Sequence, residues 1–393
     1  MTVAKKMQEF AEKSSWIRKM FEEGARMKAE FGAENVFDFS LGNPDVPPPE
    51  KFSEVLKDLA ENDKPGVHAY MPNGGYPYVR EALARRLSKE QDVTLDQGDI
   101  LMTCGAAGGL NVVMKSLLDP GDEVIILSPF FVEYNFYVDN HGGVTKIVAT
   151  DEEFNLDIPA IEAALSEKTK AVLINSPNNP TGQVYSAESL KELGLLLDKA
   201  GEQFCRSIYL LSDEPYRKIV FDDCEVPSIM ATTTNSIVVS SYSKDLSLPG
   251  ERIGYIAVHP EMKEKTALLD AMTLANRILG FVNAPALMQR VVEQLQDVSV
   301  DSSIYARRRE VFCKVLDEAG FEYVKPKGAF YLFPKTPIDD VEFCTLLQEE
   351  KILAVPGRGF GAPGYIRLAF CINEDVIARS ADAFKRAMAK AGK

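Results

Sequence analysis

Apolar and polar positions follow two alternating patterns between residues 99 and 258. Short runs of consecutive apolar residues recur, and stretches with apolar residues at helical spacing lie between several of them. Such runs are typical of strands buried on both faces, and their alternation with helices predicts βα units that form a mostly parallel sheet. The predicted strands are residues 99–104, 122–127, 170–175, 207–212 and 236–241. The predicted helices are 108–118, 157–167 and 186–201, the last beginning at the N-cap Ser186 and ending at Gly201.

The pattern changes after residue 258. Helical spacing covers residues 261–279, 284–296 and 303–320; strand-like pieces then return at 328–334, 352–357 and 365–370, before a final helix near 374–391. This order predicts an α+β lobe. The proline-rich stretch 44–49 marks a crossing between lobes, and 393 residues exceed the size of one ordinary core. We therefore expect a large α/β domain at 46–280, with its sheet sandwiched by helices. Residues 1–45 and 281–393 form a smaller domain.

Composition narrows the functional classes. The formal charge of −14 argues against nucleic acid, whose binding depends on clustered Lys and Arg. Six scattered cysteines form no CxxC pair and no metal-ligand spacing, so neither a zinc site nor another metal is expected. No run of eighteen apolar residues occurs, and the N-terminus lacks the apolar segment of a signal peptide. We expect a cytoplasmic protein that does not enter the membrane.

Distinctive residues follow each of the five predicted strands. Ligands of open α/β sheets bind outside the carboxyl ends of the strands, so these residues are expected to face one pocket. They are Gly105-Ala106-Ala107, Pro129-Phe130-Phe131, Asn178-Asn179-Pro180, Asp213-Glu214-Pro215-Tyr216 and Tyr242-Ser243-Lys244.

Lys244 is the residue of this set with the most specific chemistry. A shielded, neutral lysine is the nucleophile that imine formation requires, whereas most lysines are simply exposed. The sequence "SYSK" also contains the Ser-x-x-Lys spacing of serine acyl enzymes, but the companion "SDN" and "KTG" motifs are absent. "CGAAGG" does not have the GxGxxG spacing of dinucleotide-binding proteins, so a dehydrogenase is not supported.

Several motifs together resemble one family. "SYSKDLSLPGERIGY" is similar to the cofactor-lysine signature of class I/II aminotransferases of the pyridoxal-phosphate fold type I family. "YMPNGGYPYVREALA", "NNPTG", "SDEPY", "GAFY" and "PGRGFGAPGYIRL" agree with that family in kind and order, from about Leu41 to Arg367. The resemblance implies pyridoxal 5′-phosphate as cofactor, held as an internal aldimine on Lys244. It also implies ping-pong transfer of an amino group between an α-amino acid and a 2-oxo acid.

The resemblance implies roles for residues around the cofactor. Asp213 pairs with the pyridine nitrogen, and Asn179 and Tyr216 donate to the phenolic oxygen, so Lys244, Asp213 and Tyr216 are the predicted catalytic residues. Phe131 stacks on the ring, with Phe130 as its competitor. The predicted phosphate ligands are Gly105, Ala106, Ala107, Ser241 and Arg252, and the positions after Gly105 offer only backbone N–H groups.

The resemblance also implies how substrate is held. Arg367 grips the α-carboxylate, and Gly42 and Asn179 lie beside it. Tyr70 reaches the phosphate of a neighbouring subunit, so a homodimer with shared active sites is expected. Arg277 lies in a region that faces the partner's site in related dimers, but its register is open, as is the identity of the amino acid.

Two alternatives stay open at this stage. A C–S β-lyase of the same fold uses nearly the same residues, because one cofactor serves several reactions. A metabolite-sensing regulator would carry an added DNA-binding module, and only about forty residues without a basic recognition helix precede the lobe.

Overall fold

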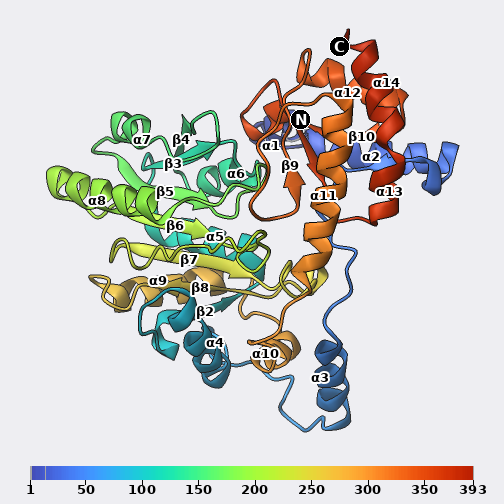
Figure 1. Cartoon of the computed structure of the whole chain (residues 1–393). Helices are drawn as coiled ribbons and strands as arrows, with labels where there is room; N and C mark the ends of the chain where they lie inside the picture. Colours follow the sequence, from blue (N-terminus) through green and yellow to red (C-terminus); the bar gives the residue numbers. More distant parts are fainter. Residues whose placement is uncertain (1, 14, 393) are drawn as a thin grey trace.

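The computed structural model describes residues 2–13 and 15–392, with the side chains of residues 12–21 outside the description. Its centre is a seven-stranded sheet in the large lobe (Figure 1). All neighbouring strands pair in parallel except those on either side of β8, which is antiparallel to both neighbours. The strand order is β2 (Ile100–Thr103), β8 (Gly254–Val258), β7 (Ser236–Ser241), β6 (Tyr209–Asp213), β5 (Thr169–Asn175), β3 (Glu123–Ser128), β4 (Val144–Ala149).

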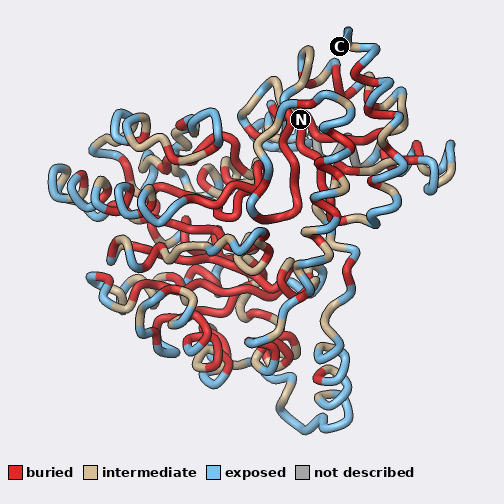
Figure 2. The backbone as a smooth tube through the Cα atoms, in the orientation of Figure 1, coloured by how far each residue is buried: buried red, intermediate tan, exposed pale blue. Residues whose placement is uncertain are grey.

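The predicted mostly parallel sheet is confirmed, and each predicted run overlaps a strand to within two residues at either end. β4 and β8 were not among those runs. β4 lies at the edge of the sheet, where only Val148 of its six residues is buried, and it lacks a continuous apolar run. β8 is buried throughout but directly follows the polar loop after Lys244. Figure 2 shows the central strands buried along most of their length.

Helices cover both faces of this sheet. Successive strand residues point to opposite faces: Ile125 and Leu127 join one core cluster, whereas Val124 and Ile126 join another. The first cluster includes side chains of α4 (Pro77–Glu90), α8 (Ala187–Phe204) and α10 (Ala286–Glu293), with α3 (Glu50–Glu61) and α7 (Ile158–Ala164) also packed there. The second includes α5 (Gly105–Leu117), α6 (Glu133–Asp139) and α9 (Lys265–Ile278).

The small lobe joins both ends of the chain (Figure 1). β1 pairs in parallel with β10, and β11, β12 and β9 form an antiparallel sheet. Its strands are β1 (Phe37–Asp38), β9 (Tyr331–Leu332), β10 (Ile352–Leu353), β11 (Val355–Pro356) and β12 (Ile366–Ala369). Its helices are α1 (Lys5–Lys13), α2 (Ser15–Phe31), α11 (Ser302–Ala319), α12 (Asp340–Glu349), α13 (Glu374–Arg379) and α14 (Ala381–Lys390). Short 3-10 helices are η1 (Ala33–Asn35), η2 (Gln97–Asp99), η3 (Pro249–Glu251) and η4 (Gly357–Phe360).

The hydrophobic cluster into which each side chain packs indicates where one domain ends, and the expected boundary was residue 280. Side chains of α10 as far as Leu295 pack into the large-lobe cluster, whereas Val300 and Tyr305 belong to the small-lobe cluster. We propose that the chain crosses between the lobes at residues 295–300, because a domain is defined by the core that its side chains share.

The end of α8 and the C-terminal helix differ from their predictions. Ser186 caps α8 as expected, its Oγ accepting from the Ser189 N–H at 3.1 Å. The predicted end at Gly201 is wrong: the Gly201 carbonyl accepts from the Arg206 N–H in the closing turn, after the left-handed Cys205. The single helix expected near 374–391 is two helices that meet at Ser380, whose hydroxyl donates to the Ile377 carbonyl. Among the described residues, no helix is both long and apolar enough to span a bilayer.

Candidate active site

A pocket of about 320 Å³ lies at the carboxyl ends of the central strands, where residues of the small lobe also reach it. Every residue to which the resemblance gives a role lines it except Gly105 and Tyr70. Six other strand-end residues were expected to face the pocket but do not line it: Pro129, Phe130, Asn178, Pro180, Glu214 and Tyr242. The large lobe contributes Ala106, Ala107, Phe131, Asn179, Asp213, Tyr216, Ser241, Lys244 and Arg252, and the small lobe contributes Leu41, Gly42, Tyr331 and Arg367. Parallel strands end at one edge, which is why loops distant in sequence meet here.

Lys244 lies on the loop after β7, and its Nζ donates to the Gly42 carbonyl at 2.8 Å. The aromatic rings of Tyr216 and Phe330 lie within about 6 Å of the amine, at 6.0 and 5.4 Å from Nζ to the ring centroids. Loss of solvent lowers the pKa of Lys244 to about 8; the nearby Cys371 opposes this shift and Arg367 adds to it. A larger fraction of Lys244 is therefore neutral near pH 7 than for an exposed lysine.

Asp213 ends β6 and is 6% exposed. Its Oδ2 accepts from the Tyr134 hydroxyl at 2.7 Å, and its Oδ1 is buried without a hydrogen-bond partner in the described structure. Burial raises the pKa of Asp213 to about 7, Tyr134 lowers it by hydrogen bonding, and the charge of Glu214 raises it. A buried carboxylate oxygen without a partner is costly, and a protonated pyridine nitrogen is a group that would satisfy it.

The predicted phosphate ligands lie at the start of α5, at Ser241 and at Arg252, which line the pocket. No side chain caps the first turn of α5, so its N–H groups are free to bind an anion at Ala106 and Ala107. Gly105 packs beneath Arg252, because a Cβ at Gly105 would lie 2.7 Å from Arg252 Nη2. A helix N-terminus beside a guanidinium suits a phosphate dianion.

Arg367, predicted to bind the substrate carboxylate, also lines the pocket. It is 3% exposed and lies between the rings of Tyr331 and Phe360, with its Cζ 4.7 and 4.8 Å from their centroids. Its Nη1 donates to Asn179 Oδ1 at 3.1 Å and its Nη2 to the Ser40 carbonyl at 2.6 Å, whereas Nε has no partner in the described structure. Contacts on several sides thus hold the guanidinium in place, and its Nε–H is left to donate to a substrate carboxylate.

Phe131 and Phe130 lie in different environments. Phe131 lines the pocket, with its ring edge-to-face with Tyr134 at 5.6 Å. Phe130 is buried in the core, where a Cβ at Gly361 would lie 2.6 Å from its ring. Of the two, Phe131 has the position needed to stack on a ring in the pocket.

Two residues with a predicted role and one open candidate lie outside the lining. Gly105 supports Arg252 from behind. Tyr70 is 90% exposed, so its predicted contact with a second subunit's phosphate stays a prediction. Arg277 is exposed in the last turn of α9.

Several lining residues were missed from sequence, among them Tyr134, Asn175 and Tyr331. Asn175 ends β5, where its Nδ2 donates to the Asp213 carbonyl at 2.7 Å. The Tyr331 hydroxyl lies 2.9 Å from the Tyr216 hydroxyl. A Cβ at Gly42 would lie only 1.9 Å from the Tyr331 hydroxyl. Signals existed, since Tyr134 follows Phe131 by about one helical turn and Tyr331 closes the "GAFY" motif.

Comparisons with known proteins agree with this geometry. Residues 34–384 match the family model "Aminotransferase class I and II". A probable aspartate/prephenate aminotransferase of Aquifex aeolicus is 33% identical, over 90% of this chain and 91% of that one. An aspartate aminotransferase of Thermotoga maritima is 33% identical, over 93% and 95%.

Solved structures are similar over the same extent. The crystal structure of an amino transferase from Eubacterium rectale has a TM-score of 0.96 and 38% identity, covering 100% of both chains. An aspartate aminotransferase of Thermus thermophilus with maleate has a TM-score of 0.86 and 28% identity, covering 95% and 96%.

Proposed function

The chain belongs to the class I and II aminotransferase family, and from this premise we propose that its pocket binds pyridoxal 5′-phosphate on Lys244. The family moves amino groups between amino acids and 2-oxo acids, and this chain is such a transferase. The observation that carries the cofactor assignment is the placement of Lys244 and the unpartnered Asp213 Oδ1 in one pocket, with Arg252 and Arg367 also in its lining.

When bound, pyridoxal phosphate supplies an electron sink for the negative charge left as the substrate α-proton departs. Asp213 would hold a proton and positive charge at the ring nitrogen. Ser241, Arg252 and the first turn of α5 would hold the phosphate. Phe131 would pack on the ring.

Lys244 Nζ would take the proton from the substrate α-carbon and return it to the cofactor, since its lowered pKa suits both steps near neutrality. Asn179 Oδ1 already accepts from Arg367, which leaves Nδ2 to donate to the phenolic oxygen together with the Tyr216 hydroxyl. Arg367 would fix the α-carboxylate and so orient the α-proton toward Lys244.

We propose a homodimer in which Tyr70 of each subunit reaches the other subunit's phosphate, and a cytoplasmic location, which the six unpaired cysteines support. The substrates would be an amino acid and a 2-oxo acid. Relatives named aspartate aminotransferase place aspartate first among donors to be tested. The cations that line the pocket within the described subunit are Lys244, Arg252 and Arg367, so a second carboxylate would need a partner residue such as Arg277.

The reaction is tested by adding single amino acids to the cofactor-loaded protein without any oxo acid. We expect loss of the cofactor's visible absorbance and one equivalent of 2-oxo acid per site, with turnover only after an acceptor is added. Aspartate, alanine, leucine and phenylalanine form the first panel. Continuous release of ammonia and pyruvate without an acceptor would instead identify the β-lyase reaction.

Two variants test the residue assignments. Lys244→Ala should lose the covalent attachment and nearly all turnover while it stays folded. Arg367→Ala should keep the cofactor absorbance and raise the amino-acid concentration for half-saturation about 100-fold, because a buried bidentate contact is lost. Full activity in Lys244→Ala would refute the central assignment.

A further inference from the structure

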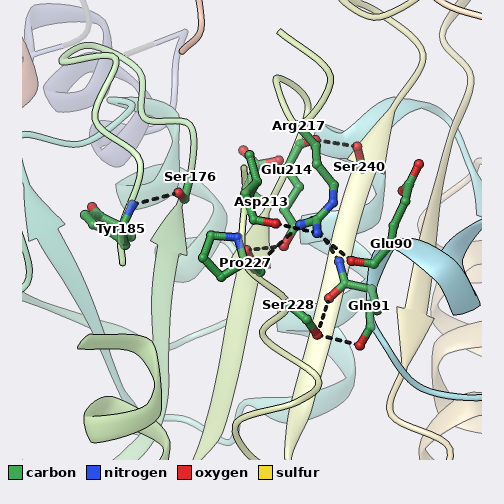
Figure 3. A network of polar contacts seen from close by, with 12 residues as sticks. Glu90, Gln91, Ser176, Tyr185, Asp213, Glu214, Arg217, Pro227, Ser228 and Ser240 are labelled. Atoms are coloured by element: carbon green, nitrogen blue, oxygen red, sulfur yellow. Dashed lines mark hydrogen bonds and ion pairs between the residues drawn. The ribbon is translucent and has the colours of Figure 1, made fainter. Parts of the chain in front are cut away.

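Glu214 directly follows Asp213 but is not among the residues that line the pocket. It is 3% exposed, and both carboxylate oxygens are bonded. Ser212 Oγ donates to Oε1 at 2.9 Å, while Gln91 Nε2 and Arg217 Nη1 donate to Oε2 at 3.0 and 2.9 Å. Figure 3 shows Glu214, Gln91 and Arg217 converging beside Asp213. Burying a carboxylate here is tolerable only because each oxygen has a donor.

Arg217 connects this carboxylate to two other segments. Its Nη2 donates to the Glu90 carbonyl at 2.6 Å, at the end of α4, and to the Val226 carbonyl at 2.8 Å. Ser228 Oγ donates to the Gln91 side chain at 3.1 Å, closing the network (Figure 3). The loop after β6 is thus fastened to α4 and to residues 226–228 through one buried ion pair.

The backbone of Glu214 is fixed as well. Its N–H donates to the Val239 carbonyl at 2.9 Å, and its carbonyl accepts from Ser240 Oγ at 2.8 Å. The side chain of Asp213, by contrast, has a single hydrogen bond, from Tyr134 on α6. The backbone of Asp213 is held on one side by the pairing of β6 with β5 and β7, and on the other side by the firmly bonded Glu214.

We propose that Glu214 and Arg217 are positioning residues, which hold the Asp213 carboxylate where the cofactor's ring nitrogen binds. This inference rests on the proposed function. The charged and titratable groups that bear on Asp213 are Glu214 beside it and Tyr134 and Tyr137 on α6.

Glu214→Gln tests the proposal, because it keeps the side-chain volume but removes the charge that pairs with Arg217. We expect the dissociation constant of pyridoxal phosphate to rise about tenfold, the effect of losing one charge-assisted buried contact. A displaced carboxylate holds less positive charge on the ring, which moves the pH midpoint of the cofactor's visible absorbance to higher pH. We expect this displacement to outweigh the loss of the Glu214 charge, which by itself lowers the pKa of Asp213.

Asp99→Asn is the matched control. Asp99 is 1% exposed, pairs with Lys265 and lies outside the pocket lining. Both variants should lower the melting temperature of the cofactor-free protein, but only Glu214→Gln should change affinity and pH midpoint. Equal changes in both variants, unchanged values in Glu214→Gln, or a midpoint that moves to lower pH would overturn the proposal.

Two further measurements keep the outcome clear. If Glu214→Gln fails to fold, Ser212→Ala serves instead, because it removes a single donor to the Glu214 carboxylate. It should raise the dissociation constant of pyridoxal phosphate about twofold to threefold and move the pH midpoint of the absorbance to higher pH. A folded Ser212→Ala with the wild-type dissociation constant and midpoint overturns the proposal. If the wild-type protein takes up no pyridoxal phosphate, the proposed function itself fails, and this inference with it.

Discussion

Lys244 and Asp213 line the same pocket, and loss of solvent moves their pKa values toward each other, to about 8 and about 7. Each shift disfavours the charged form of its group. Neither value can be read from sequence, because both depend on which atoms surround the side chain. Each yields a separate measurable consequence.

The first consequence concerns loading of the cofactor-free protein with pyridoxal phosphate. Only the neutral amine of Lys244 attacks a carbonyl, so the rate should rise with pH and level off above a midpoint near 8. Stopped-flow absorbance between pH 6 and 10 measures this. Lys170→Ala, which removes a half-buried lysine of β5, should give the same profile. A midpoint near the ordinary lysine value of about 10.4 would contradict the assignment.

The second consequence concerns stability. Because the folded-state pKa of Asp213 lies above its ordinary value of 3.8, the folded protein binds that proton more tightly than the unfolded chain. This contribution is present at low pH and is lost as the pH rises through 7. From pH 5 to pH 8, the free energy of unfolding should fall by on the order of 2 to 3 kcal/mol relative to Asp213→Asn.

Urea unfolding of the cofactor-free proteins at several pH values checks this difference. Tyr134→Phe provides the second comparison, since losing the hydroxyl donor should raise the pKa of Asp213 and move the fall to higher pH. A difference between wild type and Asp213→Asn that stays constant from pH 5 to 8 would show that this carboxyl does not titrate there.

At the scale of elements, the start of α5 combines a backbone requirement with a packing requirement. Gly105 has a φ of 71°, in the left-handed region, and touches Arg252. Gly121 has a φ of 91°, but nothing lies within 4 Å of where its Cβ would be. An alanine at Gly105 would therefore bring both backbone strain and a clash with Arg252, whereas an alanine at Gly121 would bring backbone strain alone.

Gly105→Ala should weaken pyridoxal phosphate binding at least about tenfold, because the new methyl group displaces Arg252. Gly121→Ala should cost a similar strain of about 1 kcal/mol in unfolding free energy while leaving cofactor affinity unchanged. Equilibrium titration of the cofactor measures both. Equal affinities in the two variants would remove Arg252 from the predicted phosphate site.

At the scale of the whole molecule, Tyr70 is 90% exposed in one subunit, and its proposed role in the partner subunit's site can be tested by mixing variants. If it serves the partner's site, Lys244→Ala and Tyr70→Ala subunits should complement each other. A mixed dimer has one site with both defects and one intact site, so random mixing should restore about a quarter of wild-type activity. Mixed subunits that stay as inactive as the separate variants would show that the sites are not shared.

The sequence by itself determined the predicted strands of the mostly parallel sheet, and it predicted most of the residues that line the pocket. Both follow from local information, since a buried strand needs a continuous apolar run, and the functional residues directly follow such strands. It did not predict β4, because an edge strand needs fewer apolar positions. It also did not predict the end of α8, because the left-handed residue that ends the helix is Cys205 and not a glycine.

Only the tertiary structure decided the contacts made between elements. Tyr134 was missed because its role exists only where α6 meets β6, and Tyr331 because the small lobe must close on Tyr216. The choice of Phe131 over Phe130 and the network around Glu214 depend likewise on packing between distant segments. Apolar spacing and motifs are properties of neighbouring residues, whereas pKa values, hydrogen bonds and pocket lining arise from atoms that the fold brings together.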